Sequence, residues 1–217
     1  MKSNWGEVAK ARFCNYTGKF YCTDCHANEM TIIPARVLHR WNFDIKTVSK
    51  FALIHLGNNK HKPLLRIIEL NKALYQKQLK TVLPIRQRMW LVREFIFSCR
   101  SKDTLLEQLG SRSYLLEDPH AYSMVDLYQH YNNKFVPFLT EANEKLLLHV
   151  KTQCLSCQGK GDFCEICNHP QVIFGFETDK VTKCPKCNAL YHMTCFTPFK
   201  VQCPKCIRMS TIRRKRI

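Results

Sequence analysis

Five pairs of possible metal ligands, each pair separated by two other residues, lie between positions 154 and 206. Cysteine thiolates and histidine imidazoles are preferred ligands of Zn²⁺, and a Cys-x-x-Cys turn supplies two of them from one tight knuckle. One such pair would be weak evidence, but five in so short a stretch predict structural zinc. The pairs are Cys154/Cys157, Cys164/Cys167, Cys184/Cys187, His192/Cys195 and Cys203/Cys206.

The last four pairs follow the order used by the cross-brace zinc modules of RING, PHD and FYVE-like domains. In a cross-brace, the first pair shares a metal with the third pair, and the second pair shares one with the fourth. Interleaving ties together segments that are distant in the sequence, which a module with so few core residues needs. The predicted zinc sites are Cys164, Cys167, His192 and Cys195 for one ion, and Cys184, Cys187, Cys203 and Cys206 for the other.

The remaining pair, Cys154 and Cys157, has two possible uses that spacing alone does not separate. The pair completes a site with Cys22 and Cys25, which would staple the two ends of the chain together. Alternatively, it takes the first place in the cross-brace and releases the pair that follows it. Both alternatives stay open from the sequence.

Three further residues are candidate metal ligands, but each has another plausible role in the structure. Cys14 and His26 are balanced between metal binding and ordinary packing. Cys99 falls on an apolar helical stripe, which favours a buried thiol. The other histidines are expected not to be ligands.

The ligand set predicts structural rather than catalytic metal. The Cys-rich spheres would be filled, whereas a catalytic zinc keeps an open position. The sequence contains no His-Glu-x-x-His motif, no phosphate-binding glycine loop and no nucleophile elbow. We therefore expect no enzymatic activity.

Thirteen cysteines and a formal net charge of +17 restrict the cellular setting and the partners. No signal peptide is evident, and no apolar run approaches the roughly 20 residues of a membrane-spanning helix. We therefore expect reduced cysteines in the cytosol or nucleus. The charge favours anionic partners such as nucleic acid, acidic lipid or an acidic protein face, without choosing among them.

The cysteine-poor middle of the chain reads as helical. Apolar residues recur at three- and four-residue steps from Leu64 to Val82 and again from Ile85 to Ile96, and Pro84 either kinks the first helix or opens the second. Ser123 followed by Asp126 predicts a capped helix start. A mainly α fold is expected, in which a helical bundle platform carries a short zinc-binding head and the C-terminal cross-brace module. The expected segments are the cysteine head (1–34), the helical region (35–152), the zinc module (153–208) and a basic tail (209–217).

Several stretches, in order along nearly the whole chain, resemble the Rubicon-homology domain family of Rubicon, Pacer, the PLEKHM adaptors and the small Def-type proteins. The head and the Pro-Ala-Arg-Val-Leu-His-x-Trp stretch look closest to the PLEKHM and Def branch. The matching stretches are KARFCNYTGKFYCTDCH, IPARVLHRWNFDIKTVSKFA, FSCR, CLSCQGKGDFCEIC, and CPKCNALYHMTCF followed by CPKC.

The resemblance implies a non-enzymatic adaptor that binds a GTP-loaded Rab-family small GTPase of late endosomes and lysosomes. Such an adaptor acts in autophagy, endolysosomal maturation or lysosome positioning. It would be cytoplasmic and peripheral on late endosomes, lysosomes and autophagosomes, with its membrane association resting on the GTPase.

The resemblance also assigns ligands for two to four Zn²⁺ ions. By position it makes ligands of all five C-terminal pairs and of Cys22 and Cys25, and Cys14, which matches a family cysteine, is a further candidate ligand. Family members usually carry a further Cys-x-x-Cys upstream of the position of Cys14, which this sequence does not include. The metal stoichiometry of the head therefore stays open.

Two other classes of protein are weighed against the adaptor. A RING-type ubiquitin ligase would need an exposed hydrophobic patch, for which Phe174, Phe176 and Phe199 are available, although a small module favours their use as core. A nucleic-acid-binding zinc protein would use the charge and the basic tail at 212–217. Because the basic residues are dispersed and no DNA-reading motif occurs, we do not expect nucleic acid as a partner.

Overall fold

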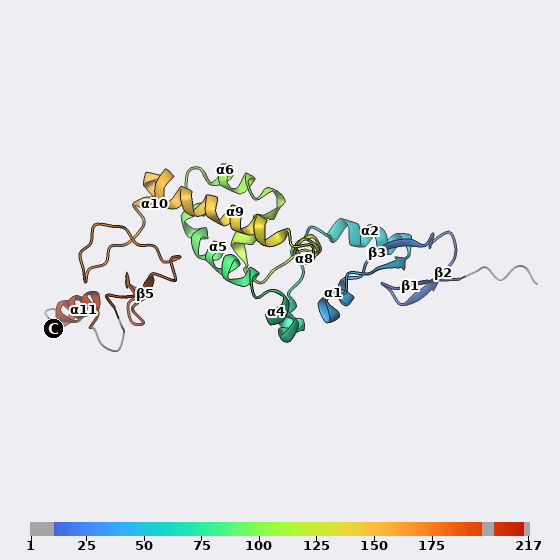
Figure 1. Ribbon diagram of the computed structural model, residues 1–217, viewed down its shortest axis with the longest axis horizontal. Coiled ribbons are helices and arrows are strands. Elements are labelled where there is room, and N and C mark those ends of the chain that lie inside the picture. The colour runs from blue at the N-terminus through green and yellow to red at the C-terminus, as the bar shows by residue number, and fades with distance from the viewer. Residues whose placement is uncertain (1–10, 197–201, 215–217) are drawn as a thin grey trace, which may run out of the picture. The chain divides into compact units, whose positions relative to one another are not determined.

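The computed structural model describes residues 11–196 and 202–214, and helices are its main secondary structure (Figure 1). Phe199 and the last residues of the basic tail, 215–217, lie outside the described residues. The helices are α1 (Pro34–Arg40), α2 (Lys50–Asn59), α3 (Ile67–Leu70), α4 (Lys72–Gln78), α5 (Val82–Phe97), α6 (Lys102–Glu107), α7 (Tyr114–Glu117), α8 (Met124–Tyr131), α9 (Phe135–Leu148), α10 (Leu155–Gln158) and α11 (Pro204–Arg214). The strands are β1 (Arg12–Cys14), β2 (Lys19–Tyr21), β3 (Glu29–Ile32), β4 (Ile45–Val48), β5 (Val181–Lys183) and β6 (Leu190–His192).

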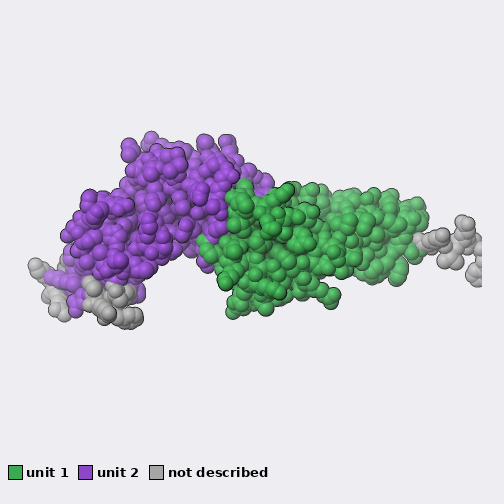
Figure 2. All heavy atoms as spheres, viewed as in Figure 1, with its two compact units in different colours: residues 1–84, 120–139 green, residues 85–119, 140–217 purple. Residues whose placement is uncertain are grey.

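The chain folds as two compact units, which Figure 2 shows in different colours. Unit 1 consists of residues 1–84 and 120–139, and unit 2 of residues 85–119 and 140–217. The predicted helical region, 35–152, contributes to both units. The cysteine head thus belongs to unit 1, and the C-terminal Cys-rich segment to unit 2.

A hairpin and a second antiparallel strand pair, whose strands are connected through α1, form the cysteine-bearing end of unit 1. β1 pairs with β2, so that Phe13 faces Phe20 across the strands, and β3 pairs with β4. Gly18 lies in the turn of the β1–β2 hairpin with φ +69°, a left-handed backbone conformation that residues other than glycine rarely adopt. Alternation along β1 turns Cys14 inward. The buried cluster beneath these two strand pairs consists of Cys14, Ile33, Val48 and Ala52.

Two helices of unit 1, α8 and α2, begin at serine caps that the sequence makes recognisable. The capping box at the start of α8 is confirmed, because the Ser123 side chain accepts from the Asp126 backbone N–H and the Asp126 carboxylate accepts from the Ser123 N–H. Ser49 likewise caps α2, accepting from the Ala52 N–H at 3.3 Å.

The first apolar stripe forms two short helices instead of the single helix that the periodicity predicts. Asn71 leaves the helical backbone conformation, with φ −151° and ψ 83°, and its side chain accepts from the Leu74 N–H to start α4. An Asn that bonds to the nearby backbone competes with helix continuation. Pro84 lies in the first turn of α5, so it opens the next helix and does not kink the previous one.

Unit 2 joins two long helices to the C-terminal Cys-rich segment. The second apolar stripe faces inward as predicted, with Met89, Val92 and Ile96 of α5 fully buried. Phe174 and Phe176 are also buried, and their rings stack with centroids 5.0 Å apart. Among the described residues, no helix has both the length and the apolar character needed to cross a bilayer.

Candidate metal centres

Three groups of four cysteine and histidine side chains converge in unit 2. Within each group the ligand atoms all lie within 4.8 Å of one another. Each group could therefore hold one metal ion. The groups are Cys164, Cys167, His192 and Cys195 (group A), Cys184, Cys187, Cys203 and Cys206 (group B), and Cys99, His149, Cys154 and Cys157 (group C).

The separations within the groups fit a tetrahedral zinc ion. With Zn–S of about 2.3 Å and Zn–N of about 2.0 Å, tetrahedral geometry places two sulfurs about 3.8 Å apart and a sulfur and a nitrogen about 3.5 Å apart. In group B, Cys184 Sγ lies 3.7 Å from Cys206 Sγ. In group A, Cys167 Sγ lies 3.4 Å from His192 Nδ1. The donor sets and their spacing thus fit Zn²⁺.

Groups A and B contain the same eight residues that the cross-brace prediction combines. Two of the knuckles share one local structure, a Cys-x-x-Cys turn closed by an asparagine with positive φ: Asn168 at 53° and Asn188 at 57°. The asparagine N–H donates to the carbonyl of the first cysteine, at 2.9 Å in both knuckles. Asparagine tolerates this left-handed conformation better than most residues. Metal occupancy itself stays a prediction.

The thiol of Cys164 in group A lies where the thiolate is stabilised. Burial alone would raise its pKa, but backbone N–H donors of Cys167, His192 and Ile166 lower the pKa to about 6. The thiolate is the form of cysteine that binds metal. This knuckle therefore favours the ligand form of Cys164 before any ion arrives.

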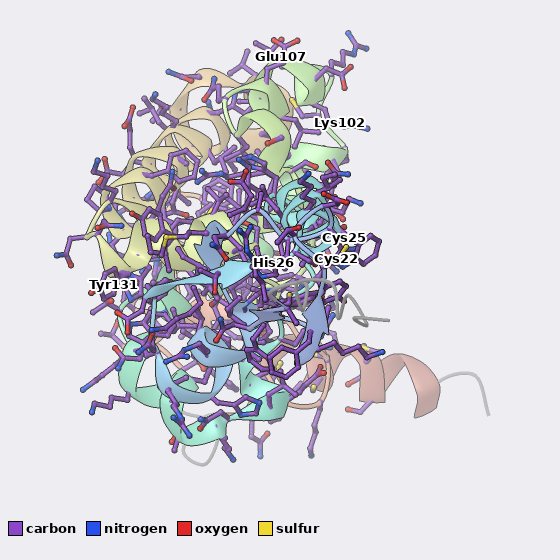
Figure 3. All side chains as sticks on the ribbon, turned by 90° about the vertical axis from the view of Figure 1, so that its right-hand side faces the viewer. Cys22, Cys25, His26, Lys102, Glu107 and Tyr131 are labelled. Carbon is purple, nitrogen blue, oxygen red and sulfur yellow. The ribbon has the colours of Figure 1, made fainter. Side chains whose placement is uncertain are left out.

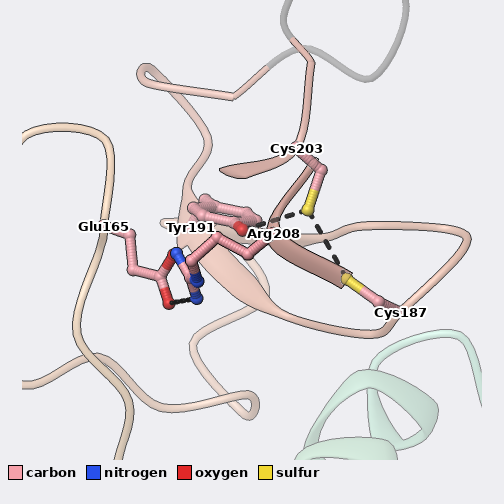
Figure 4. Close-up of polar contacts among 5 residues, drawn as sticks. All are labelled: Glu165, Cys187, Tyr191, Cys203 and Arg208. Atoms are coloured by element: carbon pink, nitrogen blue, oxygen red, sulfur yellow. Dashed lines mark hydrogen bonds and ion pairs between the residues drawn. The ribbon is translucent and has the colours of Figure 1, made fainter. Parts of the chain in front are cut away.

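Group B is built on the hairpin of β5 and β6, whose turn carries Cys184 and Cys187. Cys203 and Cys206 come from the start of α11, and Cys203 Sγ lies 3.5 Å from Cys187 Sγ (Figure 4). The buried Tyr191 hydroxyl lies 3.1 Å from Cys203 Sγ. Burial and then this hydrogen bond raise the pKa of Tyr191, so the hydroxyl remains protonated and donates to the sulfur.

An ion pair connects groups A and B outside the ligand spheres. Glu165 lies in the first knuckle of group A, and Arg208 lies on α11 beside the ligands of group B. The guanidinium donates to both carboxylate oxygens, at 2.6 and 2.8 Å (Figure 4). The geometry is bidentate, which fixes the orientation of α11 relative to the knuckle.

Group C overturns both alternatives for Cys154 and Cys157. The structure places them with Cys99 and His149 and not in a cross-brace or with the head cysteines. Cys99 Sγ lies 3.3 Å from His149 Nε2 and 3.9 Å from Cys154 Sγ. Cys99 is buried, as predicted, but it is also a potential ligand, and so is His149, which the sequence places among the histidines not expected to be ligands.

A π-helical turn at the end of α9 (His149–Gln153) positions the two halves of group C. Its wide turn is closed by the Cys154 N–H, which donates to the His149 carbonyl at 3.0 Å. Such turns inside or at the end of α-helices are frequent at functional sites. The spacing His-x-x-x-x-Cys-x-x-Cys is the one sequence signal that points to His149.

Protonation in group C shows why a cation would stabilise it. Burial lowers the pKa of His149, which favours the neutral imidazole that metals bind. Burial, followed by the neighbouring Cys154 and Cys99, raises the pKa of Cys157 to about 12. The Cys157 thiol thus keeps its proton until a divalent cation displaces it.

The head cysteines do not form a group of this kind among the described residues. Cys22 and Cys25 are exposed neighbours (Figure 3), and hydrogen bonds from Cys25 lower the pKa of Cys22. Cys14 is buried and accepts from the Ser49 N–H at 3.3 Å. Metal binding by Cys14, Cys22 and Cys25 stays a prediction.

His26 has an ordinary structural role. It is fully buried, and its Nδ1 accepts from the Asn28 N–H at 3.1 Å. The neutral ring therefore carries its proton on Nε2, which lies 3.1 Å from the Phe13 carbonyl and donates to it. Both ring nitrogens are used by the backbone, which favours packing over metal binding.

The fold and the site define a mainly helical protein with closed Cys/His clusters that could hold metal ions. The chain matches the Rubicon Homology Domain over residues 12–211. It belongs to the Rubicon homology domain family, which confirms the resemblance seen in the sequence.

Relatives from three animals match almost the whole chain. It is 36% identical over 211 residues to human Pleckstrin homology domain-containing family M member 3, covering 95% of this chain and 28% of that protein. Identity to the Drosophila melanogaster Differentially expressed in FDCP 8 homolog is 34% over 218 residues, covering 98% and 43%. Identity to the Mus musculus Run domain Beclin-1-interacting and cysteine-rich domain-containing protein is 35% over 210 residues, covering 95% and 22%. The chain thus spans less than half the length of these relatives.

Proposed function

We propose that the protein is a non-enzymatic, zinc-stabilised adaptor that binds a GTP-loaded Rab-family small GTPase of late endosomes and lysosomes. It would act in autophagy, endolysosomal maturation or lysosome positioning, and it would associate peripherally with the membrane. The observation that carries the proposal is the family match over residues 12–211, together with three Cys/His groups that each supply four ligands. Four protein ligands fill a tetrahedral zinc and leave no open position for a substrate.

A hydrophobic surface on unit 1 supports binding to a partner protein. A groove of 280 Å³ lies between β3, α2 and α8, and a second of 260 Å³ shares part of its lining. Lys60 lines both grooves, and neither is lined by an acidic residue. The apolar residues that line the first groove are Ile32, Pro34, Leu53, Leu56, Met124, Val125 and Tyr128.

The groove suits a GTPase because nucleotide exchange reorders the switch regions of these proteins. A partner that reads the GTP-bound state must bury side chains of the ordered switches against a complementary surface. Aromatic residues at such surfaces often account for a large share of the binding energy. Tyr128 lines the groove and is 47% exposed, which makes it a candidate anchor.

We expect the protein to capture the GTP-locked form of its GTPase and not the GDP-locked form. Replacing Tyr128 by alanine should weaken capture about tenfold or more, since a central aromatic anchor contributes about 2 kcal/mol. Pull-down with the two locked forms, followed by titration calorimetry, measures both effects.

Leu70→Ala is the matched control, because Leu70 is exposed on α3 of the same unit but lines neither groove. Its capture should equal that of the unmodified protein. Equal capture of the two nucleotide forms, or capture of neither, contradicts the proposed function. If Tyr128→Ala and Leu70→Ala both lose capture of the GTP-locked form, the groove is wrong as the binding surface, but the proposed function is not contradicted.

The burial of two phenylalanines weakens the case for a RING-type ubiquitin ligase. The hydrophobic patch it requires would include Phe174 and Phe176, but these side chains are 3% and 1% exposed. Both rings pack edge-on against Phe95 of α5 within unit 2. They act as core, which is the use that the sequence favoured.

A further inference from the structure

The β1–β2 hairpin presents two phenylalanines to solvent on the side opposite its buried face. Phe13 and Phe20 are directly paired in the strand register, and their ring centroids lie 5.2 Å apart. Phe13 is 45% exposed and Phe20 is 70% exposed, whereas Cys14 next to Phe13 is fully buried. Packing within the unit explains Cys14, but it leaves the outward pair unexplained, since a polar residue would suit an exposed strand face equally well.

Other aromatic groups extend this surface from the hairpin turn onto α2. The ring of Tyr16 stacks with His55 at a centroid distance of 6.0 Å, and His55 stacks with Phe51 at 6.1 Å. Phe51 and Ile54 are exposed by 67% and 63%. An exposed apolar surface of this kind on one unit indicates a contact with something outside the chain.

The part of unit 1 that carries the hairpin, residues 11–60, has more basic than acidic residues. Lys19 precedes Phe20 in β2, and Lys50 precedes Phe51 at the start of α2; both lysines are exposed. Residues 11–60 contain seven Lys and Arg but only three Asp and Glu. These residues are Arg12, Lys19, Arg36, Arg40, Lys46, Lys50 and Lys60 against Asp24, Glu29 and Asp44.

We propose that this hairpin inserts Phe13 and Phe20 into the surface of an anionic lipid bilayer, with the neighbouring lysines at the headgroups. Aromatic rings flanked by basic residues bind at the boundary between headgroups and acyl chains, through apolar burial and attraction to anionic lipid together. Neither phenylalanine lines the grooves assigned above to a protein partner. Tyr16 and His55 line the second groove, so the membrane contact is assigned to the phenylalanine pair alone, and the grooves keep a protein as their occupant.

The inference goes beyond the proposed function, in which the membrane is reached only through the GTPase. A direct contact would give the adaptor two weak membrane signals, one through its partner and one through its own hairpin. Two such signals acting together hold a peripheral protein far more firmly than either alone.

Flotation of the full chain with vesicles tests the proposal without any GTPase. We expect the zinc-loaded protein to float with vesicles of phosphatidylcholine mixed with phosphatidylserine and not with phosphatidylcholine alone. Binding should fall as salt is raised, because salt screens the attraction between lysines and anionic headgroups.

The hairpin variants show whether these residues make the contact. Phe13→Ser combined with Phe20→Ser should lower the partition coefficient about tenfold or more. Phe20→Ser alone should give a smaller loss with the hairpin undisturbed, since this side chain is largely exposed. Leu70→Ser is the matched control, being 57% exposed elsewhere in unit 1, and should float like the unmodified protein.

A fluorescent residue reports insertion directly. Phe20→Trp should shift its emission to shorter wavelength with mixed vesicles and should be quenched by brominated lipid, relative to the unmodified chain with its own tryptophans. Failure to float with either vesicle, or equal flotation of the double serine variant, overturns the proposal. If the double variant instead loses only GTPase capture, or only self-association in light scattering, the surface binds protein and the proposal is wrong.

Discussion

Replacing Cys184 by serine lowers the zinc content by at least one ion per chain and unfolds the C-terminal Cys-rich module. Cys184 is a ligand of group B and also part of the buried cluster of this module. Three of the eight buried members of that cluster are themselves cysteines, which leaves few apolar side chains to hold the fold. Structural zinc contributes about 10 kcal/mol or more to such folds, so the loss should amount to several kcal/mol.

Elemental analysis of the purified variant measures the missing ion, and circular dichroism during heating measures the loss of stability. Lys186→Ser is the matched control, because Lys186 lies in the same knuckle but is exposed and is not a ligand. It should retain all its zinc. His192→Ala should remove the ion of group A by the same reasoning. Full zinc content in Cys184→Ser would refute group B as a metal site.

Replacing His149 by alanine removes a different ion, that of group C. Its imidazole joins α9 to Cys99 on one side and to the Cys154 knuckle on the other, with Nε2 lying 3.7 Å from Cys157 Sγ. Without it, three buried or half-buried thiols remain with one position of the tetrahedron vacant. We expect loss of this ion and destabilisation of unit 2 by several kcal/mol.

His149→Cys separates the ligand role from packing, because a thiolate should restore a four-ligand sphere and with it the zinc. His169→Ala provides the control for loss of an exposed histidine outside the three groups. Zinc analysis and thermal unfolding of the three variants measure the outcome. If His149→Ala keeps the same zinc content as His169→Ala, group C does not bind metal.

The membership of groups A and B could be predicted from the sequence because their ligands are local pairs. Each Cys-x-x-Cys knuckle is fixed by a few backbone hydrogen bonds, so two ligands can be read from one short stretch. Group C is different, because Cys99 and His149 lie 50 residues apart and neither belongs to a pair. Only the fold of unit 2 brings them together, with Cys99 just after the end of α5 and His149 just after the end of α9.

The same distinction applies to the fold. The start of α8 could be predicted because a capping box is a contact between residues three apart, Ser123 and Asp126. The three short strand pairs could not, since strands of three or four residues show too little alternation to be distinguished from loops. The role of His26 could not be predicted either, because it depends on backbone groups of Phe13 and Asn28 that come into reach only in the folded chain.

The most direct test is the number of zinc ions per folded chain in a Cys22→Ser/Cys25→Ser variant, counted by native mass spectrometry. These changes remove any ion bound at the head, so the three groups of unit 2 should alone determine the count. We predict three ions, each with sulfur or mixed sulfur and nitrogen ligands in X-ray absorption. Two ions or fewer, or an ion that keeps a water ligand, would contradict a scaffold of closed metal spheres.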